Sequence, residues 1–319
     1  MDVLDVSSSS LLTVGNPKTV KGQRYGFRTA VLHLSPARLS GVANVCPNAT
    51  PGCELACLNT AGRGGMSLGS IDVRASGDNV IQRARRRRTA WLFGDRGAFL
   101  LALRDDIARH IKRAKRDGLV PVVRLNGTSD IRWEAAPYWL DGASLFDHFP
   151  AVQFYDYTKL ANRRGLPANY HLTFSLAETE RNRADAVRAL DAGLSVAVVL
   201  RGAGDSVHKR PFPATWNGRA LVDGDDSDLR FLDPPSVFVG LRAKGRAKRD
   251  TSGFVYDVSE TYDYLTEGGS DARTNPASPS RAVRRIRPTT ADNGRAVRLQ
   301  RTRRRTVRSA GDSANGRAV

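Results

Sequence analysis

The sequence predicts an α/β fold with a largely parallel sheet. Two continuous apolar runs, residues 119–125 and 194–200, are rich in valine and leucine, as in strands buried on both faces of a parallel sheet. Segments with helical periodicity alternate with the predicted strands. Polar residues follow nearly every predicted strand, where barrels and open α/β sheets build their sites. We favour an incomplete barrel over an open doubly wound sheet.

The remaining elements can be placed between these two runs and around them. Weaker strand candidates cover residues 27–34, 151–155, 170–174 and 236–241. A helix over 97–117 carries an apolar stripe that includes Leu100, Leu103 and Ile107, and another helix covers about 79–93. A third helix follows Ser175 and Glu178, which have capping-box spacing, and ends before Gly193.

Charge and composition divide the chain into three parts. Residues 1–24 are an N-terminal extension, 25–265 an α/β barrel-like domain, and 266–319 a disordered tail, because the tail has too little apolar sequence to form a core. The formal net charge is +18, and residues 281–319 hold twelve arginines against two aspartates. This Arg-rich tail predicts contacts with nucleic-acid phosphates through 281–319, or a solvated tail without a partner.

Two classes of protein are excluded by composition. The sequence has no apolar run long enough for a membrane span and no basic segment leading into an apolar one at its start, so we expect no membrane association. The three cysteines are an odd number packed between Cys46 and Cys57, which argues against a disulfide framework. A reducing cytoplasm is therefore the expected location.

The cysteine loop, residues 46–57, is the main functional signal. Cys46, Cys53 and Cys57 lie in a loop rich in Pro, Gly and Asn, which suits surface thiols that converge on a metal centre. Tetrahedral zinc would need a fourth ligand, for which His33 is the nearest histidine along the chain. An iron–sulfur cubane held by three cysteines would leave one iron open. Without a metal, the thiols would be either redox-active or inert and buried.

Other polar residues are candidates to contact a cofactor or substrate because they follow predicted strands. They are Asn126, Asp130, Lys159, Ser175, Arg242 and Lys244. Each could instead be an ordinary turn or cap residue. Four consecutive arginines, Arg85 to Arg88, cover most of a helix circumference, so either one points toward the sheet or all face solvent. The acidic stretch 223–233 is interpreted as a loop that pairs with basic groups, with a metal or ribose contact as the alternative.

The cysteine loop occurs together with three other motifs: RLNGTSD at 124–130, FYDYTK at 154–159 and GLRAKG at 240–245. In this combination the chain resembles the gene product 88 family of actinobacterial phages over roughly residues 25–258. The family has no assigned activity, and the resemblance implies a location in the cytoplasm of the host cell. More distantly, a first strand, a three-cysteine loop and βα units resemble the radical S-adenosylmethionine (SAM) enzymes. Here the cysteines are spaced C-x6-C-x3-C, where that superfamily usually has C-x3-C-x2-C.

The radical SAM resemblance implies a partial (β/α)6 barrel and a [4Fe–4S] cluster on Cys46, Cys53 and Cys57, with SAM bound at the open iron. The first hypothesis is therefore a phage iron–sulfur enzyme acting on an unidentified substrate. The second is a non-catalytic nucleic-acid-binding phage protein with a structural Cys3His zinc site. The sequence leaves the substrate, the oligomeric state and the choice between DNA and RNA open.

Overall fold

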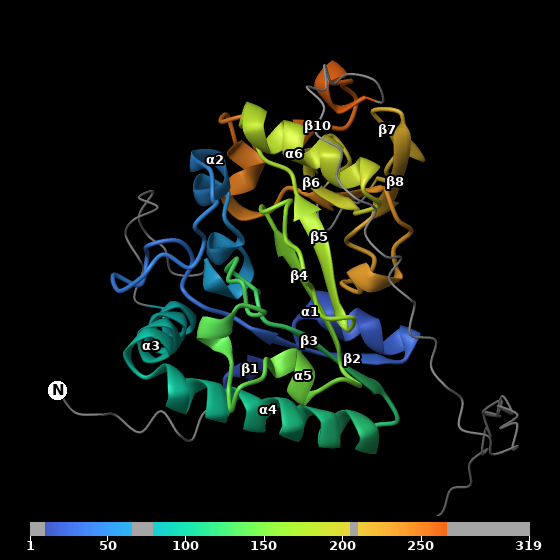
Figure 1. Ribbon diagram of the computed structural model, residues 1–319. Helices are drawn as coiled ribbons and strands as arrows, with labels where there is room; N and C mark the ends of the chain where they lie inside the picture. The colour runs from blue at the N-terminus through green and yellow to red at the C-terminus, as the bar shows by residue number, and fades with distance from the viewer. Residues whose placement is uncertain (1–9, 66–78, 205–209, 267–319) are drawn as a thin grey trace, which may run out of the picture. The chain divides into compact units, whose positions relative to one another are not determined.

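The computed structural model of the protein describes residues 10–65, 79–204 and 210–266, and Figure 1 shows the arrangement of their helices and strands. All six predicted strands are present, and each runs parallel to its neighbours among them in the order β2-β3-β4-β5-β6-β9. Their bounds are β2 (Phe27–Leu32), β3 (Val120–Arg124), β4 (Gln153–Thr158), β5 (Tyr170–Ser175), β6 (Val196–Arg201) and β9 (Phe238–Arg242).

Four further strands, which the sequence analysis did not predict, complete the ten-stranded sheet. They are β1 (Leu12–Thr13), β7 (Thr215–Trp216), β8 (Arg219–Asp223) and β10 (Tyr256–Asp257). β1 pairs with β2 and β7 with β8, both antiparallel, while β8 is parallel to β9, and β10 adds to β6. In the described part of the chain the end strands β1 and β7 do not pair, so the sheet is not closed. The α/β class is thus confirmed, but the barrel is not.

Two long helices and one of intermediate length flank the sheet. α3 (Val80–Gly94) leads into α4 (Arg96–Arg116), which contacts β2 and β3 and runs along the bottom of Figure 1. α6 (Glu180–Asp191) packs on β5 and β6. Its N-cap is Thr179 and not Ser175 as the capping-box spacing suggested, while Gly193 takes the predicted left-handed position after its end (φ 90°).

The remaining helical segments are short. The α-helical ones are α1 (Pro17–Val20), α2 (Pro51–Leu55) and α5 (Leu145–His148). The 3-10 turns are η1 (Lys21–Tyr25), η2 (Leu58–Thr60), η3 (Gly62–Gly64), η4 (Ala136–Tyr138), η5 (Arg230–Leu232), η6 (Gly245–Arg249) and η7 (Asp263–Leu265). No helix of the described segments combines the length and apolar character that a membrane crossing requires.

The helices bury one face of the sheet in two apolar cores. The first core joins α4, through Leu103 and Ile107, to residues of β2, β3 and β4 such as Phe154. The second core joins α6 to β5, β6 and β9, and it includes Leu265 of η7. Because side chains alternate along a strand, the remaining residues of the same strands point to the opposite face, which we call the inner face.

The inner face is covered by the acidic loop, residues 223–233, which carries η5. Leu229 and Phe231 of this loop pack against Phe27, Val122 and Tyr155. The aspartates of the loop form the ion pairs with basic residues that the sequence predicted, among them Asp228 with Lys18 and Arg124 and Asp225 with Lys244. The predicted Arg-rich tail lies outside the described residues.

The inner-face histidine of β5 makes stability depend on pH. Burial, and next the charge of Arg230, lower the pKa of His171 to about 4, against 6.5 in an unfolded chain. As the pH falls from about 6.5 to about 4, the unfolded state takes up a proton that the folded state does not, so the free energy of unfolding decreases. We expect the free energy of unfolding of His171→Gln to fall by on the order of 1–3 kcal/mol less than that of the wild type between pH 7 and pH 4, as measured by urea unfolding at pH 7, 5 and 4. An equal fall in both proteins would contradict this prediction.

Candidate functional site

The three cysteines are neighbours in the folded chain. Cys46 lies in the loop after β2, Cys53 in α2, and Cys57 two residues after α2, where it caps η2. All three are unpaired thiols that are partly buried. Burial raises the pKa of Cys46 to about 12 and that of Cys57 to about 11, and Cys53 lies close enough to both for its charge to add to each rise. The charges of the cysteines therefore act on one another, which places the three thiols in the same part of the fold.

Backbone amides point at two of the sulfur atoms. The N–H of Ala37 donates to Cys46 Sγ (3.3 Å), and the N–H of Asn59 donates to Cys57 Sγ (3.5 Å). Cys46 also lies beside the end of β3, because its thiol contacts the carbonyl of Thr128 at 3.7 Å. Amide donors favour the thiolate form, which is the form that binds metals.

Glu178, which follows β5, holds α2 in place. Its Oε2 accepts a hydrogen bond from the Thr50 hydroxyl (2.7 Å) and its Oε1 accepts one from the Gly52 amide (2.8 Å). Thr50 is in turn the N-cap of α2 and accepts from the amide of Cys53. A Cβ atom on Gly52 would lie 2.8 Å from the Glu178 carboxylate and 2.4 Å from Ser252 Oγ, so only glycine permits this close approach. Glu178 thus fixes the position of Cys53 relative to the sheet.

Arg85 of α3 approaches the site from the other side. Its guanidinium donates to the side chain of Asn59, and its charge favours the thiolate of Cys57. One member of the arginine run therefore points toward η2 and Cys57. Arg88, by contrast, donates to the backbone of Ser10.

Three of the predicted contact residues meet beside Cys53. Lys159 Nζ donates to Ser175 Oγ (2.8 Å), and the Lys159 amide donates to Asp130 Oδ2 (2.9 Å). The ammonium group also lies 5.2 Å from the centre of the Phe254 ring. The charge of Lys159 lowers the pKa of Cys53, although burial raises it overall. Lys159, Ser175 and Asp130 thus form a polar rim next to the thiols.

Asn126 organises the loop that carries Asp130. Its Oδ1 accepts hydrogen bonds from the Ile131 amide, the Ser129 hydroxyl and the Trp133 indole, and its amide nitrogen donates to the Ile131 carbonyl. The residue is 3% exposed. Its side chain therefore acts on the site through the shape of the loop.

Arg242 and Lys244 point elsewhere. Arg242 Nη1 donates to both carboxylate oxygens of Asp223 (2.9 and 3.0 Å), and Lys244 Nζ donates to Asp225 (2.7 Å). The structure thus directs both charges to the acidic loop, whereas Lys159, Ser175 and Asp130 stay beside the cysteines.

No three His, Cys, Asp or Glu side chains in the described segments are grouped tightly enough to hold a single metal ion. His33 Nδ1 is hydrogen-bonded to the hydroxyl of Thr13 (3.0 Å). The described residues therefore form no compact Cys3His group around His33.

Two contacts of the site were not found from the sequence. Glu178 was interpreted as part of a capping box, but it binds α2. Arg163, whose side chain is 1% exposed, pairs with Glu134 and lies 3.9 Å from Asp130. Both depend on residues far apart in sequence, so no local motif signals them.

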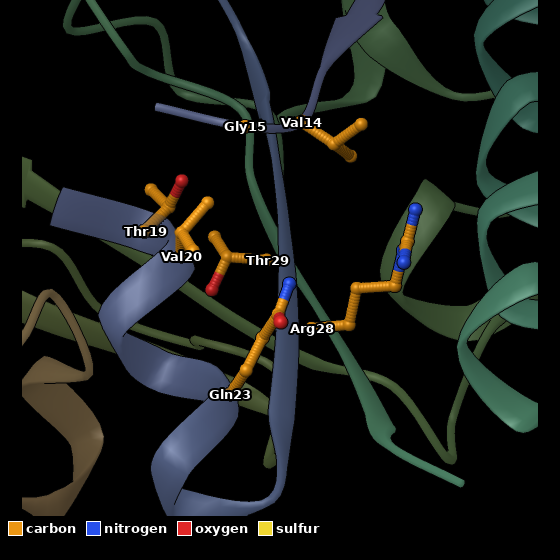
Figure 2. A pocket seen from close by; sticks show the side chains of 7 residues that line it. All are labelled: Val14, Gly15, Thr19, Val20, Gln23, Arg28 and Thr29. Atoms are coloured by element: carbon orange, nitrogen blue, oxygen red, sulfur yellow. The ribbon is translucent and has the colours of Figure 1, made fainter. Parts of the chain in front are cut away.

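A separate small pocket lies between η1 and the outer strands. Figure 2 shows Thr19, Val20 and Thr29 on one side of β2, and Val14 and Arg28 on the other. The lining is completed by Gly15 and Gln23. This pocket contains none of the predicted site residues.

Comparisons with known proteins give one match. A family model described as "Gene product 88" matches residues 10–258. No curated protein and no solved structure matches the chain.

Proposed function

The chain belongs to the gene product 88 family, and from its site we propose that Cys46, Cys53 and Cys57 hold an iron–sulfur cluster. One observation supports the proposal: at the carboxyl edge of the parallel strands Cys46 contacts Thr128 and Cys53 packs in the apolar cluster of Ala177 and Ala243, and the charge of Cys53 acts on both other thiols. Sites of α/β proteins occur at this edge.

The surroundings of the thiols support this assignment. The amides of Ala37 and Asn59 and the charges of Lys159 and Arg85 all favour thiolates. Hydrogen bonds to sulfur and partial burial are also the factors by which proteins tune the potential of a bound cluster. A cubane held by three cysteines would have one iron open to a further ligand, and it would supply single electrons for reduction.

The chain's own groups have defined roles in this proposal. Glu178 positions Cys53, and Arg85 offsets negative charge beside Cys57. Lys159, oriented by Ser175, presents an ammonium group next to Cys53. This group is suited to pair with a carboxylate of a small ligand bound at the open iron. By the resemblance to radical SAM enzymes, that ligand would be SAM.

We extend the proposal to the fold as a partial barrel. α4 and α6 pack on the same face of the sheet, through residues of the same parity along the strands. Helices on one face only are typical of barrels, whereas doubly wound sheets have helices on both. The sequential order β2-β3-β4-β5-β6 also suits a barrel.

Metal analysis tests the proposal. The full chain is purified without oxygen, its iron, acid-labile sulfide and zinc are measured, and its visible spectrum is recorded beside that of a Cys46→Ser, Cys53→Ser, Cys57→Ser triple variant. We expect about four irons and four sulfides per chain, lost in the variant. His33→Gln is the matched control and should leave the iron content unchanged.

The remaining outcomes distinguish a cluster from a zinc site. One zinc without sulfide, lost in His33→Gln, would overturn the cluster and support the structural zinc hypothesis, for which salt-sensitive binding of DNA and RNA through 281–319 is the next assay. A chain that takes up neither metal, even after reconstitution with iron and sulfide, would refute the proposal outright.

A further inference from the structure

The inner face carries a group of buried polar atoms without hydrogen-bond partners. Within the described residues these atoms include Tyr157 Oη, Thr173 Oγ1, His171 Nε2, Arg124 Nε, and Arg230 Nε and Nη1. We call these five residues the polar layer. Thr173 is 0% and Arg230 1% exposed, so solvent does not reach these two side chains. A buried polar atom without a partner destabilises a fold, so several of them on one face require an explanation.

The polar layer is continuous in space. Tyr157 on β4 is paired in register with Thr173 on β5, and Tyr155 with His171. The guanidinium carbon of Arg124 lies 5.1 Å from the centre of the Tyr157 ring. Arg230 reaches the same place from η5, because its charge acts on both His171 and Tyr157. The five residues therefore surround one region between the sheet and the acidic loop.

The free groups of the layer are mostly hydrogen-bond donors. The two guanidinium groups can only donate, and the two hydroxyls can donate as well as accept. Arg124 is paired with Asp228 (2.8 Å). Arg230 Nη1 lies 3.2 Å from Asp233 Oδ2, yet neither atom makes a hydrogen bond within the described chain. Lys18 lies 3.3 Å from Asp228 and Asp156 lies 4.0 Å from Arg124 Nε, so three cations face three carboxylates while the guanidinium and hydroxyl donors stay without acceptors.

We propose that the polar layer is a binding site for an oxyanion group, the phosphate or carboxylate of a small molecule. Such a group accepts several hydrogen bonds at once and pairs with arginine in a bidentate manner, so it would satisfy the guanidinium and hydroxyl donors together. The side chains of Tyr157 and His171 are half-buried, whereas those of Thr173 and Arg230 are buried, so the layer extends from the interior of the fold toward its surface. The site goes beyond the cysteine site and does not need a cluster.

Inorganic phosphate and acetate are the probes, with sodium chloride at matched ionic strength as the control. The chain has five histidines, so histidine-labelled protein gives few NMR signals, and His171→Asn identifies the signal of His171. We expect a saturable shift of this signal with phosphate or acetate and none with chloride. The probe that saturates at the lower concentration identifies the preferred group.

Two variants test the layer without removing a charge. Tyr157→Phe and Thr173→Val delete hydroxyls that lack a partner in the described chain, so both proteins should unfold at the same temperature as the wild type or higher. Each should weaken oxyanion binding about tenfold, the effect of losing one hydrogen bond to a charged group. Tyr264→Phe, on η7, should leave binding unchanged.

Two results would overturn the inference. The first is an unmoved His171 signal up to about 50 mM of either probe, which would assign the polar layer to water. The second is equal binding by the wild type, Tyr157→Phe and Thr173→Val, which would place the oxyanion elsewhere, for instance on the Arg-rich tail. The triple cysteine variant should bind as the wild type does, so failure of the cluster proposal would not affect this result.

Discussion

Replacing Arg124 with methionine is expected to lower the free energy of unfolding by about 3 kcal/mol at pH 7, because the substitution leaves the buried carboxylate of Asp228 short of its main partner. Asp228 is 2% exposed and keeps the hydrogen bond from the Tyr155 hydroxyl (3.2 Å) and the more distant charge of Lys18 (3.3 Å). Urea unfolding with tryptophan fluorescence measures the loss.

The pH dependence of this loss identifies its cause. Burial alone would raise the pKa of Asp228, but the charges of Arg124 and Lys18 outweigh it and hold the pKa below the ordinary value. The stabilisation is therefore present at neutral pH and lost as the pH falls below about 4. The difference in the free energy of unfolding between the wild type and Arg124→Met should become smaller as the pH is lowered from 7 to 3. A gap independent of pH would indicate lost packing instead of an unpaired charge.

A suitable control is an exposed arginine whose ion pairs are on the surface. Arg104 pairs with Asp105 (3.3 Å) and Asp141 (3.8 Å), and its side chain is 36% exposed. Arg104→Met should change the free energy of unfolding by less than about 0.5 kcal/mol. An effect as large as that of Arg124→Met would show that methionine itself, and not the burial of Asp228, causes the loss.

Under the proposed function, replacing Glu178 with leucine is expected to weaken the affinity of the cysteine site for its metal about 10- to 100-fold, the usual effect of removing a partner that orients the ligands. The variant loses both the bond from Thr50 and the bond from Gly52, so α2 and Cys53 are no longer fixed to β5. Iron content after reconstitution at limiting iron measures the change.

A second measurement does not depend on metal. In the metal-free protein, the rate at which a thiol reagent labels Cys53 should rise in Glu178→Leu, because the loop opens more often. Glu178→Gln, which keeps an acceptor for the Gly52 amide, should fall between wild type and leucine. Glu180→Leu, at the exposed first turn of α6, is the control. Unchanged labelling in Glu178→Leu would show that α2 is held by other contacts.

The strands with strong patterns were predictable and the short ones were not. The runs at 119–125 and 194–200 match β3 and β6 because continuous β-branched sequence fits a strand buried on both faces. β1, β7 and β10 have two residues each, too few for any period to emerge. Whether the sheet closes depends on the twist and stagger of many strands together, which no local pattern records.

The candidate site was predictable where strand alternation was clear. Side chains alternate between the two faces along a strand. Lys159, directly after β4, has the same parity as Tyr155 and Tyr157, and Ser175 on β5 has the same parity as His171 and Thr173. Lys159 and Ser175 therefore reach the same side of the sheet. Arg242 has the opposite parity on β9: it pairs with Leu200, a member of the second core, and points away from the cysteines. Position at a strand end was therefore an insufficient criterion, and counting parity would have separated Arg242 from Ser175.

The last segment of the second core is synthesised late. β10 pairs with the central strand β6, and Leu265 is 1% exposed against α6, so this core is incomplete until residue 265 has left the ribosome. The second core therefore closes only after almost the whole described chain has been synthesised, and until then β6 lacks its pairing with β10. Intermediates formed earlier during synthesis expose part of the apolar surface that η7 covers in the folded chain.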